Sequence, residues 1–240
     1  MIEKIDTKNF FGTWLTAHAG CDETKKDSIE SIEKAIEWQK EIDILEIDIR
    51  SFGGTLIYAH DKVFTKKIAK TKPTIKEVFE KIAKSSLMIN CDLKERGRIK
   101  EVLELSDKAG ISRDRIMFTG SVTKKEIKTI KDIDFMVFVN FGFFGIKINN
   151  KPKSFEKIKS ELNSYLGRFL KHGLNINYRK LTDKLYNFIK ENDIKISVWT
   201  VNNEKNIEDL LRLKVDNITT KNLIGATKLK QKFSYTHNEQ

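Results

Sequence analysis

Short apolar runs alternate with longer amphipathic segments along almost the whole chain. Apolar runs of about four to eight residues are typical of buried strands, whereas apolar residues three or four apart are typical of helices. The pattern predicts eight main strands, over Thr13–Ala17, Ile44–Arg50, Leu87–Lys94, Arg115–Thr119, Phe135–Asn140, Leu174–Tyr178, Lys195–Thr200 and Asp216–Thr219. A further strand or hairpin arm is expected at Thr55–Ala59, directly after the second strand.

A helix is predicted after each of the first seven strands, over Ser28–Lys40, Ile75–Lys84, Arg98–Ala109, Lys124–Ile130, Phe155–Leu170, Leu181–Glu191 and Glu204–Leu213. Gly110 and Gly173 lie where a helix is expected to give way to a strand. Eight alternating units in 240 residues favour an α/β fold, a single (β/α)8 TIM barrel, over an open sheet. One domain is expected over residues 1–240, with a polar tail over about 226–240.

The composition argues against a disordered protein, a membrane-spanning protein and a secreted protein. The chain is 39% hydrophobic and 33% charged, which indicates a globular rather than a disordered protein. No apolar run approaches the roughly 18 residues of a membrane helix, and the N-terminal residues lack the apolar core of a signal peptide. We therefore expect a cytoplasmic protein without stable membrane insertion. The two cysteines, Cys21 and Cys91, are expected to be free thiols.

The net charge of +11 raises the question of a nucleic-acid partner. The lysines are spread over the whole chain and are mixed with glutamates, as in Lys76-Glu77 and Lys124-Lys125-Glu126. This distribution favours a solvated lysine surface, and no nucleic-acid partner is predicted. The positive field would still attract anionic small molecules, including phosphodiesters.

Three carboxylates lie near the ends of predicted strands. Glu46 and Asp48 are two residues apart on the second strand and therefore share a face, and Asp92 is near the end of the third. Barrel chemistry is found at the carboxyl ends of strands, and hard cations prefer carboxylate oxygens. The predicted cofactor is one divalent cation, Mg²⁺ or Ca²⁺, held by these three residues. The alternative is an ion network in which Glu46 and Asp48 pair with Arg50 and Lys94.

Two of the four histidines, His18 and His60, also end predicted strands beside the carboxylates. The ordinary pKa of imidazole is about 6.5, so a histidine can accept or donate a proton near neutral pH. Phosphodiester cleavage needs one group that activates the nucleophile and another that protonates the leaving oxygen. His18 and His60 are therefore the candidate general acid and base. The alternative is that both are hydrogen-bonded core residues. His172, at a predicted helix end, and His237, in the tail, are given no role.

Three further features are candidates for substrate binding. Lys94 shares a strand face with Asp92, so it either contacts a phosphate or forms a salt bridge with Glu46 or Asp92. Trp199 is either a substrate platform or part of the core. The aromatic run Phe141–Phe144 follows the fifth strand and forms either an apolar lip over the site or a cover folded back onto the barrel.

The order and spacing of these residues resemble those of the glycerophosphodiester phosphodiesterase family, within the wider phosphatidylinositol-specific phospholipase C-like barrel superfamily. The motifs are His18-Ala19-Gly20, Glu46-Ile47-Asp48, His60-Asp61, Asp92-Leu93-Lys94 and Trp199-Thr200-Val201-Asn202, in order over nearly the whole chain. The resemblance implies that His18 and His60 are the acid–base pair. It also implies that Glu46, Asp48 and Asp92 hold the metal and that Lys94 contacts the phosphate.

The chain departs from the family pattern at several points. The phosphate-contacting arginine of the family is Ala19, the third metal ligand is Asp92 rather than glutamate, and Lys221 stands where an aspartate is typical. Asp27-Ser28-Ile29 replaces the Glu-Asn-Thr before the first helix. The segment after His60 is short, so no large substrate-capping insertion is expected there.

These observations predict a metal-dependent phosphodiesterase, a phosphoric diester hydrolase of lipid metabolism that acts on a glycerophosphodiester or a related small-molecule phosphodiester. The alternative is a catalytically impaired relative that binds phosphate-bearing ligands. The missing arginine favours the alternative, whereas both histidines and all three carboxylates favour the enzyme.

Overall fold

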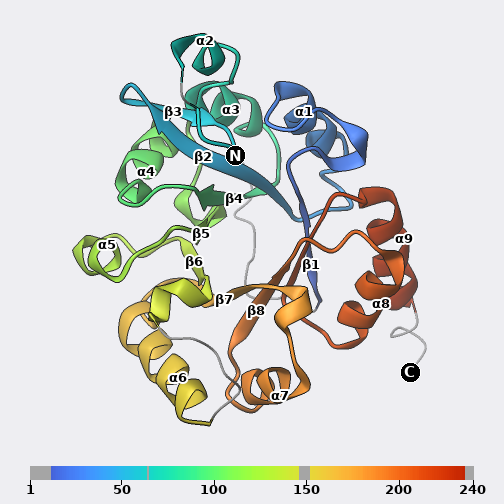
Figure 1. Ribbon diagram of the computed structural model, residues 1–240. Coiled ribbons are helices and arrows are strands. Elements are labelled where there is room, and N and C mark those ends of the chain that lie inside the picture. Colours follow the sequence, from blue (N-terminus) through green and yellow to red (C-terminus); the bar gives the residue numbers. More distant parts are fainter. Residues whose placement is uncertain (1–11, 64, 146–151, 236–240) are drawn as a thin grey trace.

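A computed structural model describes residues 12–63, 65–145 and 152–235. Eight parallel strands form a closed barrel (Figure 1): β1 (Trp14–Ala17), β2 (Ile44–Phe52), β4 (Met88–Leu93), β5 (Ile116–Gly120), β6 (Met136–Val139), β7 (Lys171–Asn177), β8 (Lys195–Trp199) and β9 (Asn217–Thr220). They follow one another around the barrel, and pairing of β1 with both β9 and β2 closes it. Strand β3 (Thr55–Tyr58) pairs antiparallel with β2 as an extra hairpin arm. The predicted TIM barrel is confirmed.

Helices surround the barrel (Figure 1): α1 (Ile29–Glu37), α3 (Ile75–Ile82), α4 (Ile99–Lys108), α5 (Lys124–Thr129), α6 (Pro152–Leu166), α7 (Asp183–Glu191), α8 (Glu204–Arg212) and α9 (Leu223–Tyr235). A four-residue helix, α2 (Lys66–Ala69), lies between β3 and α3. The seven predicted helices are present with small changes at their ends, while α2 and α9 are additional. Among the described residues, no helix is both long and apolar enough to span a membrane.

Helix α9 occupies most of the segment that we expected to be a polar tail. Its apolar residues form a narrow stripe among lysines: Ala226 is fully buried, and Leu229 and Phe233 pack against the core. Lys230 Nζ lies 2.6 Å from Asp43 Oδ2, close to the start of β2. Because the stripe is narrow, the segment looks polar in sequence although one face is packed against the barrel.

Successive side chains of each strand point alternately outward and inward, so the barrel has one apolar core under the helices and another inside the barrel. Outward-facing residues such as Leu45, Ile47 and Ile49 are fully buried beneath the helices. A separate apolar cluster consists of Trp14, Ile44, Met88, Met117, Met136 and Phe138. These six residues alternate with the outward-facing set along their strands, so they fill the amino-terminal part of the barrel interior. Further along β2, the same inward face carries Glu46 and Asp48, so the interior becomes polar toward the carboxyl ends of the strands.

Strand β7 begins earlier than its sequence pattern predicts. His172, expected at a helix end, lies in β7 and pairs in register with Val137 of β6. Gly173 was expected to mark the end of a helix, but a Cβ at this position would lie only 2.2 Å from the carbonyl oxygen of Lys195 on β8. Glycine is therefore needed there for the close approach of two strands. Gly110, with a φ of +73°, does end α4 as predicted.

The connection between β3 and α3 is short, as expected for a barrel without a large capping insertion. Its described residues carry only α2, and the end of the connection returns to β3, where the Tyr58 N–H donates to the Pro73 carbonyl at 2.8 Å. At its start, the Ala59 N–H donates to the Asp48 carbonyl at 3.0 Å. His60 is thereby held beside the carboxyl end of β2.

Two glycines with similar backbone conformations give a test of this packing. Gly120 has a φ of +80°, and a Cβ there would lie 2.1 Å from Asp92 Oδ1 and 2.4 Å from the Leu93 carbonyl oxygen; at Gly110 nothing lies within 4 Å. Gly110→Ala should lower the free energy of unfolding by about 1 kcal/mol, because only the left-handed backbone is penalised. Gly120→Ala should lower it by roughly 2–4 kcal/mol, because overpacking is added. Urea denaturation measures both, and equal losses would contradict the close packing at Gly120.

Candidate active site

A cavity of about 870 Å³ opens at the carboxyl ends of the barrel strands. Six of the seven predicted site residues line it: His18, Glu46, His60, Asp92, Lys94 and Trp199. The seventh, Asp48, is fully buried next to them. The barrel thus gathers residues that are up to 181 positions apart, from His18 to Trp199, at one rim.

The three carboxylates converge because of strand register. Asp48 lies opposite Asp92 in the β2–β4 pairing, and Glu46 is two residues before Asp48 on the same face. One oxygen from each of Glu46, Asp48 and Asp92 lies within 4.8 Å of the others. The strand geometry therefore creates a compact group of acidic oxygens without help from a loop.

One ammonium group faces these three carboxylates. Lys94 Nζ lies 2.8 Å from Asp48 Oδ1 and 2.5 Å from Asp92 Oδ2. Glu46 accepts a long hydrogen bond of 3.5 Å from Asn90 Nδ2, and Asp48 Oδ2 has no hydrogen-bond partner among the described residues. The ion network considered from sequence is thus present in part, with Lys94 as its cation. Arg50 takes no part in it.

Burial governs the electrostatics of the cluster. It raises the pKa of Glu46 well above its ordinary value, and the nearby charges of Asp92 and Asp48 raise it further. Burial also raises the pKa of Asp92, against the opposing charge of Lys94. For Lys94, burial favours the neutral form, but the carboxylates of Asp92 and Asp48 prevail and raise its pKa. With all three carboxylates ionised, the site would hold more negative charge than one lysine compensates.

The donor set fits a hard divalent cation. All three groups are carboxylates, no cysteine sulfur is among them, and a buried oxygen of Asp48 is left without a hydrogen bond. Mg²⁺ and Ca²⁺ are held in proteins by oxygen ligands of this kind, whereas zinc sites are rich in sulfur and nitrogen. A cation would also compensate the excess negative charge.

His18 follows β1 and faces the acidic group. Its Nδ1 lies 3.0 Å from the Ala19 carbonyl oxygen, and its Nε2 lies 3.8 Å from Glu46 Oε1. Because a carbonyl oxygen only accepts, Nδ1 carries a proton and Nε2 is the nitrogen turned toward Glu46. Burial lowers the pKa of His18, which favours the neutral ring. Ala19, where the resembling family has arginine, is itself buried.

His60 is held by its backbone as well as by its ring. Its N–H donates to Asp27 Oδ2 at 3.1 Å, and its carbonyl accepts from Arg50 Nε at 2.8 Å. Its ring Nδ1 lies 2.8 Å from Asp61 Oδ1, and this hydrogen bond lowers the pKa of Asp61. Asp61 is therefore ionised and accepts, so the Nδ1 of His60 carries the proton. Buried Asp27 also pairs with Lys72 Nζ at 3.1 Å.

The aromatic candidates are placed differently from one another. Trp199 is half-buried at the end of β8 and lines the cavity. Phe143 and Phe144 are buried and pack edge to face, with ring centroids 5.6 Å apart. Phe143 also lines the cavity and packs against Tyr165. The run Phe141–Phe144 therefore folds back onto the barrel, the second of the two arrangements considered from sequence.

Sequence reasoning overlooked several polar residues of the cavity. Asn140 and Asn175 line it, and Asn175 Nδ2 donates to Asn140 Oδ1 at 3.0 Å. Arg96, Ser121 and Lys124 line it as well. A signal was present in the chain, because both asparagines fall within the predicted strand ranges: Asn175 lies in β7, and Asn140 directly follows the last residue of β6. His237, given no role from sequence, lies outside the described residues.

No protein-family model matches the chain, and no curated protein matches it significantly. Solved structures do match, as three examples illustrate. A glycerophosphodiester phosphodiesterase from Parabacteroides distasonis is 19% identical, with a TM-score of 0.69 over 95% of this chain and 98% of that one. One from Thermotoga maritima is 21% identical, with a TM-score of 0.63 over 93% of this chain and 99% of that one.

The third example is an Oleispira antarctica phosphodiesterase in complex with the product sn-glycerol-3-phosphate. It is 16% identical, with a TM-score of 0.66 over 93% of this chain and 98% of that one. The overlap covers nearly all of both chains in each case, although sequence identity is low. The chain therefore has the barrel fold of solved glycerophosphodiester phosphodiesterases.

Proposed function

We propose that the protein is a metal-dependent phosphodiesterase that hydrolyses a glycerophosphodiester or a related phosphodiester. The observation that carries the proposal is the buried acidic group of Glu46, Asp48 and Asp92, which faces one ammonium and lies beside two histidines in one cavity. That cavity is at the end of the barrel where chemistry takes place in such folds. The fold shared with solved phosphodiesterases supports the same reaction class.

Glu46, Asp48 and Asp92 would hold one Mg²⁺ or Ca²⁺. When bound, the cation supplies positive charge that polarises a phosphate oxygen and balances the charge that develops during cleavage. Lys94 remains charged between Asp48 and Asp92 and lines the cavity, so it neutralises a second phosphate oxygen. With Ala19 in place of an arginine, Lys94 takes a larger share of phosphate binding.

The two histidines divide the proton transfers. Both carry their proton on Nδ1, on His18 toward the Ala19 carbonyl and on His60 toward Asp61. Each Nε2 is therefore the nitrogen that exchanges a proton with the reacting groups. One histidine, in its neutral form, takes the proton of the nucleophile on Nε2. The other must carry a proton on both ring nitrogens, and it gives the Nε2 proton to the leaving oxygen and returns to the neutral form. Trp199 offers an aromatic face at the rim against which the alcohol of the substrate packs.

A second candidate function is phosphate-ligand binding without turnover. It is favoured by the ammonium of Lys94 inside the acidic group and by Ala19 at the arginine position. A screen of phosphodiesters with and without EDTA, with products identified by phosphorus NMR, separates the two. EDTA-sensitive release of a phosphomonoester supports the enzyme. Binding of phosphate ligands without a product from any diester supports the alternative.

The first prediction in this group concerns the metal. At about 100 times its Kd, Mg²⁺ or Ca²⁺ should stabilise the protein by about 2.7 kcal/mol, which raises Tm by about 5–10 °C in a chain of this size. Glu46→Gln removes one buried charge at constant volume and should abolish the rise. Glu95→Gln, on the same rim but outside the acidic group, should keep it. Differential scanning calorimetry with and without metal measures the three proteins.

An absent metal response in the wild-type protein would mean that Lys94 alone compensates the carboxylates. An undiminished response in Glu46→Gln would mean that the metal binds elsewhere. Either result would remove the metal from the proposed mechanism.

The next prediction concerns the histidines. His18→Ala and His60→Ala should each lower kcat/KM by about 100-fold or more, the usual scale for general acid–base catalysis. His172→Ala is a matched control, because His172 lies on β7 outside the cavity. It should leave kcat/KM nearly unchanged. Near-wild-type turnover by either of the first two variants on the best diester would exclude that histidine as an acid or base.

A further inference from the structure

The segment between His60 and α3 has an unusual charge pattern. Residues 61–74 contain five lysines and one acidic residue, Asp61, whose carboxylate is paired with the His60 ring. Elsewhere many lysines alternate with acidic residues. We call residues 62–63 and 65–72 the α2 segment.

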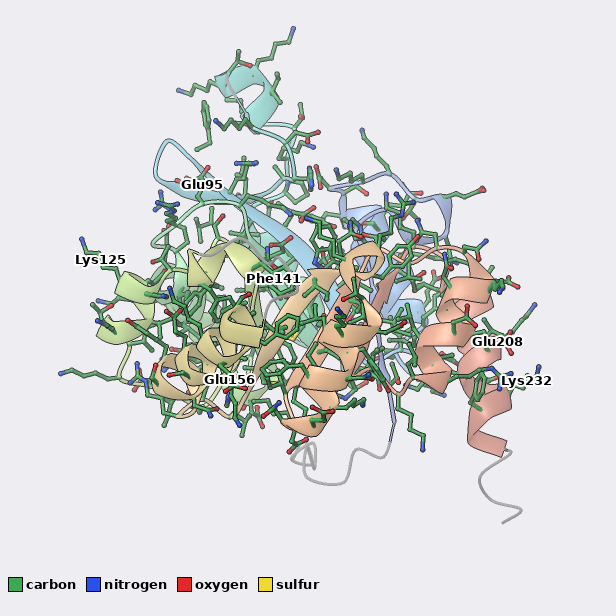
Figure 2. The ribbon with its side chains drawn as sticks, turned by 60° about the horizontal axis from the view of Figure 1, so that its bottom comes forward. Glu95, Lys125, Phe141, Glu156, Glu208 and Lys232 are labelled. Atoms are coloured by element: carbon green, nitrogen blue, oxygen red, sulfur yellow. The ribbon has the colours of Figure 1, made fainter. Side chains whose placement is uncertain are left out.

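The α2 segment projects from the molecule. Helix α2 has no buried residue, and it stands clear of the helical ring (Figures 1 and 2). Lys62, Lys66, Lys67 and Lys70 are exposed and form no ion pair with any described residue. Ile68 is 47% exposed among them. The segment therefore presents unpaired positive charge together with apolar surface.

The projection is capped at the start of α2 and is anchored beside the candidate active site. Thr65 caps α2, accepting the Ile68 N–H at 3.2 Å. At the base of the segment, one buried carboxylate, that of Asp27, accepts from both the His60 N–H and Lys72 Nζ. His60 lines the cavity, so the segment rises from the mouth of the site.

We propose that the α2 segment is a docking surface for an anionic lipid membrane. Lysine side chains extend their charge toward lipid headgroups while their stems, together with Ile68, rest on the apolar boundary. Each lysine near an anionic surface adds about a fivefold gain in binding. A convex projection with an exposed isoleucine fits a flat lipid surface, whereas nucleic-acid sites are typically basic grooves with stacking aromatic rings.

Docking at this point deepens the proposed function, on which this step rests. It brings the mouth of the cavity to the membrane surface, so the substrate class becomes a phosphodiester that is held in the bilayer by an acyl chain. The contact is peripheral and reversible, since a short basic segment binds at the surface without spanning the bilayer.

Vesicle sedimentation tests the docking without any need for turnover. The full chain should bind vesicles of phosphatidylcholine and phosphatidylglycerol and bind those of phosphatidylcholine alone much more weakly. The triple variant Lys66→Ala/Lys67→Ala/Lys70→Ala should lower the partition coefficient about 100-fold. The control triple Lys184→Ala/Lys205→Ala/Lys228→Ala removes the same charge from α7, α8 and α9, which are not neighbours of α2 in the ring, and should lower it by less than tenfold.

A second pair of variants tests the apolar contact. Ile68→Ala should lower the partition coefficient about tenfold, whereas Ile224→Ala, at 48% exposure on α9, should leave it unchanged. Equal losses of vesicle binding in the two lysine triples would overturn the proposal. So would a DNA or RNA duplex that binds more strongly than the vesicles and loses its binding in the α2 triple.

Activity arms separate this proposal from the proposed function. On a soluble diester such as glycerophosphocholine, the α2 triple should keep the wild-type kcat/KM. On a lysophospholipid in anionic vesicles, it should lose activity in step with vesicle binding. Vesicle binding that depends on the α2 segment in a protein without turnover would overturn the enzyme but keep the docking surface. Turnover without vesicle binding would overturn the docking surface but keep the enzyme.

Discussion

The excess of buried negative charge around Glu46, Asp48 and Asp92 is the constraint on which the rest of the site depends. Ionised carboxylates out of water are unfavourable, and Lys94 pairs with only two of the three, Asp48 and Asp92. The burial of apolar side chains on the outward strand faces and in the amino-terminal interior of the barrel offsets this unfavourable free energy. Stability is thus concentrated away from the rim, and the rim is left able to bind a cation and an anionic substrate.

The barrel was predictable because strand alternation and helix periodicity are local signals. Residues that face the helices are almost all apolar, so each strand could be recognised alone. The features that were missed have tertiary causes. Gly173 resembles a helix end in sequence but serves the contact of β7 with β8. Helix α9 is stabilised by a narrow stripe around Ala226 that shows only once the barrel is present.

The candidate site was predictable where strands determine it. Glu46, Asp48 and Asp92 converge because their spacing and the β2–β4 register are fixed by the fold. Side-chain partners were not predictable, since they depend on directions that a sequence does not record. Lys94 turns into the acidic group, whereas Arg50, two residues after Asp48, turns to the His60 carbonyl. Asp27 reaches His60 across 33 positions from a left-handed backbone conformation.

Asp27 also links the chemistry of the site to the surface around it. Its carboxylate accepts from the His60 backbone and from Lys72, so the candidate acid or base and the base of the α2 segment share one buried group. Loss of either hydrogen bond would leave a buried charge short of a partner, which is unfavourable. The position of His60 is therefore linked through Asp27 to the position of Lys72, at the base of the α2 segment.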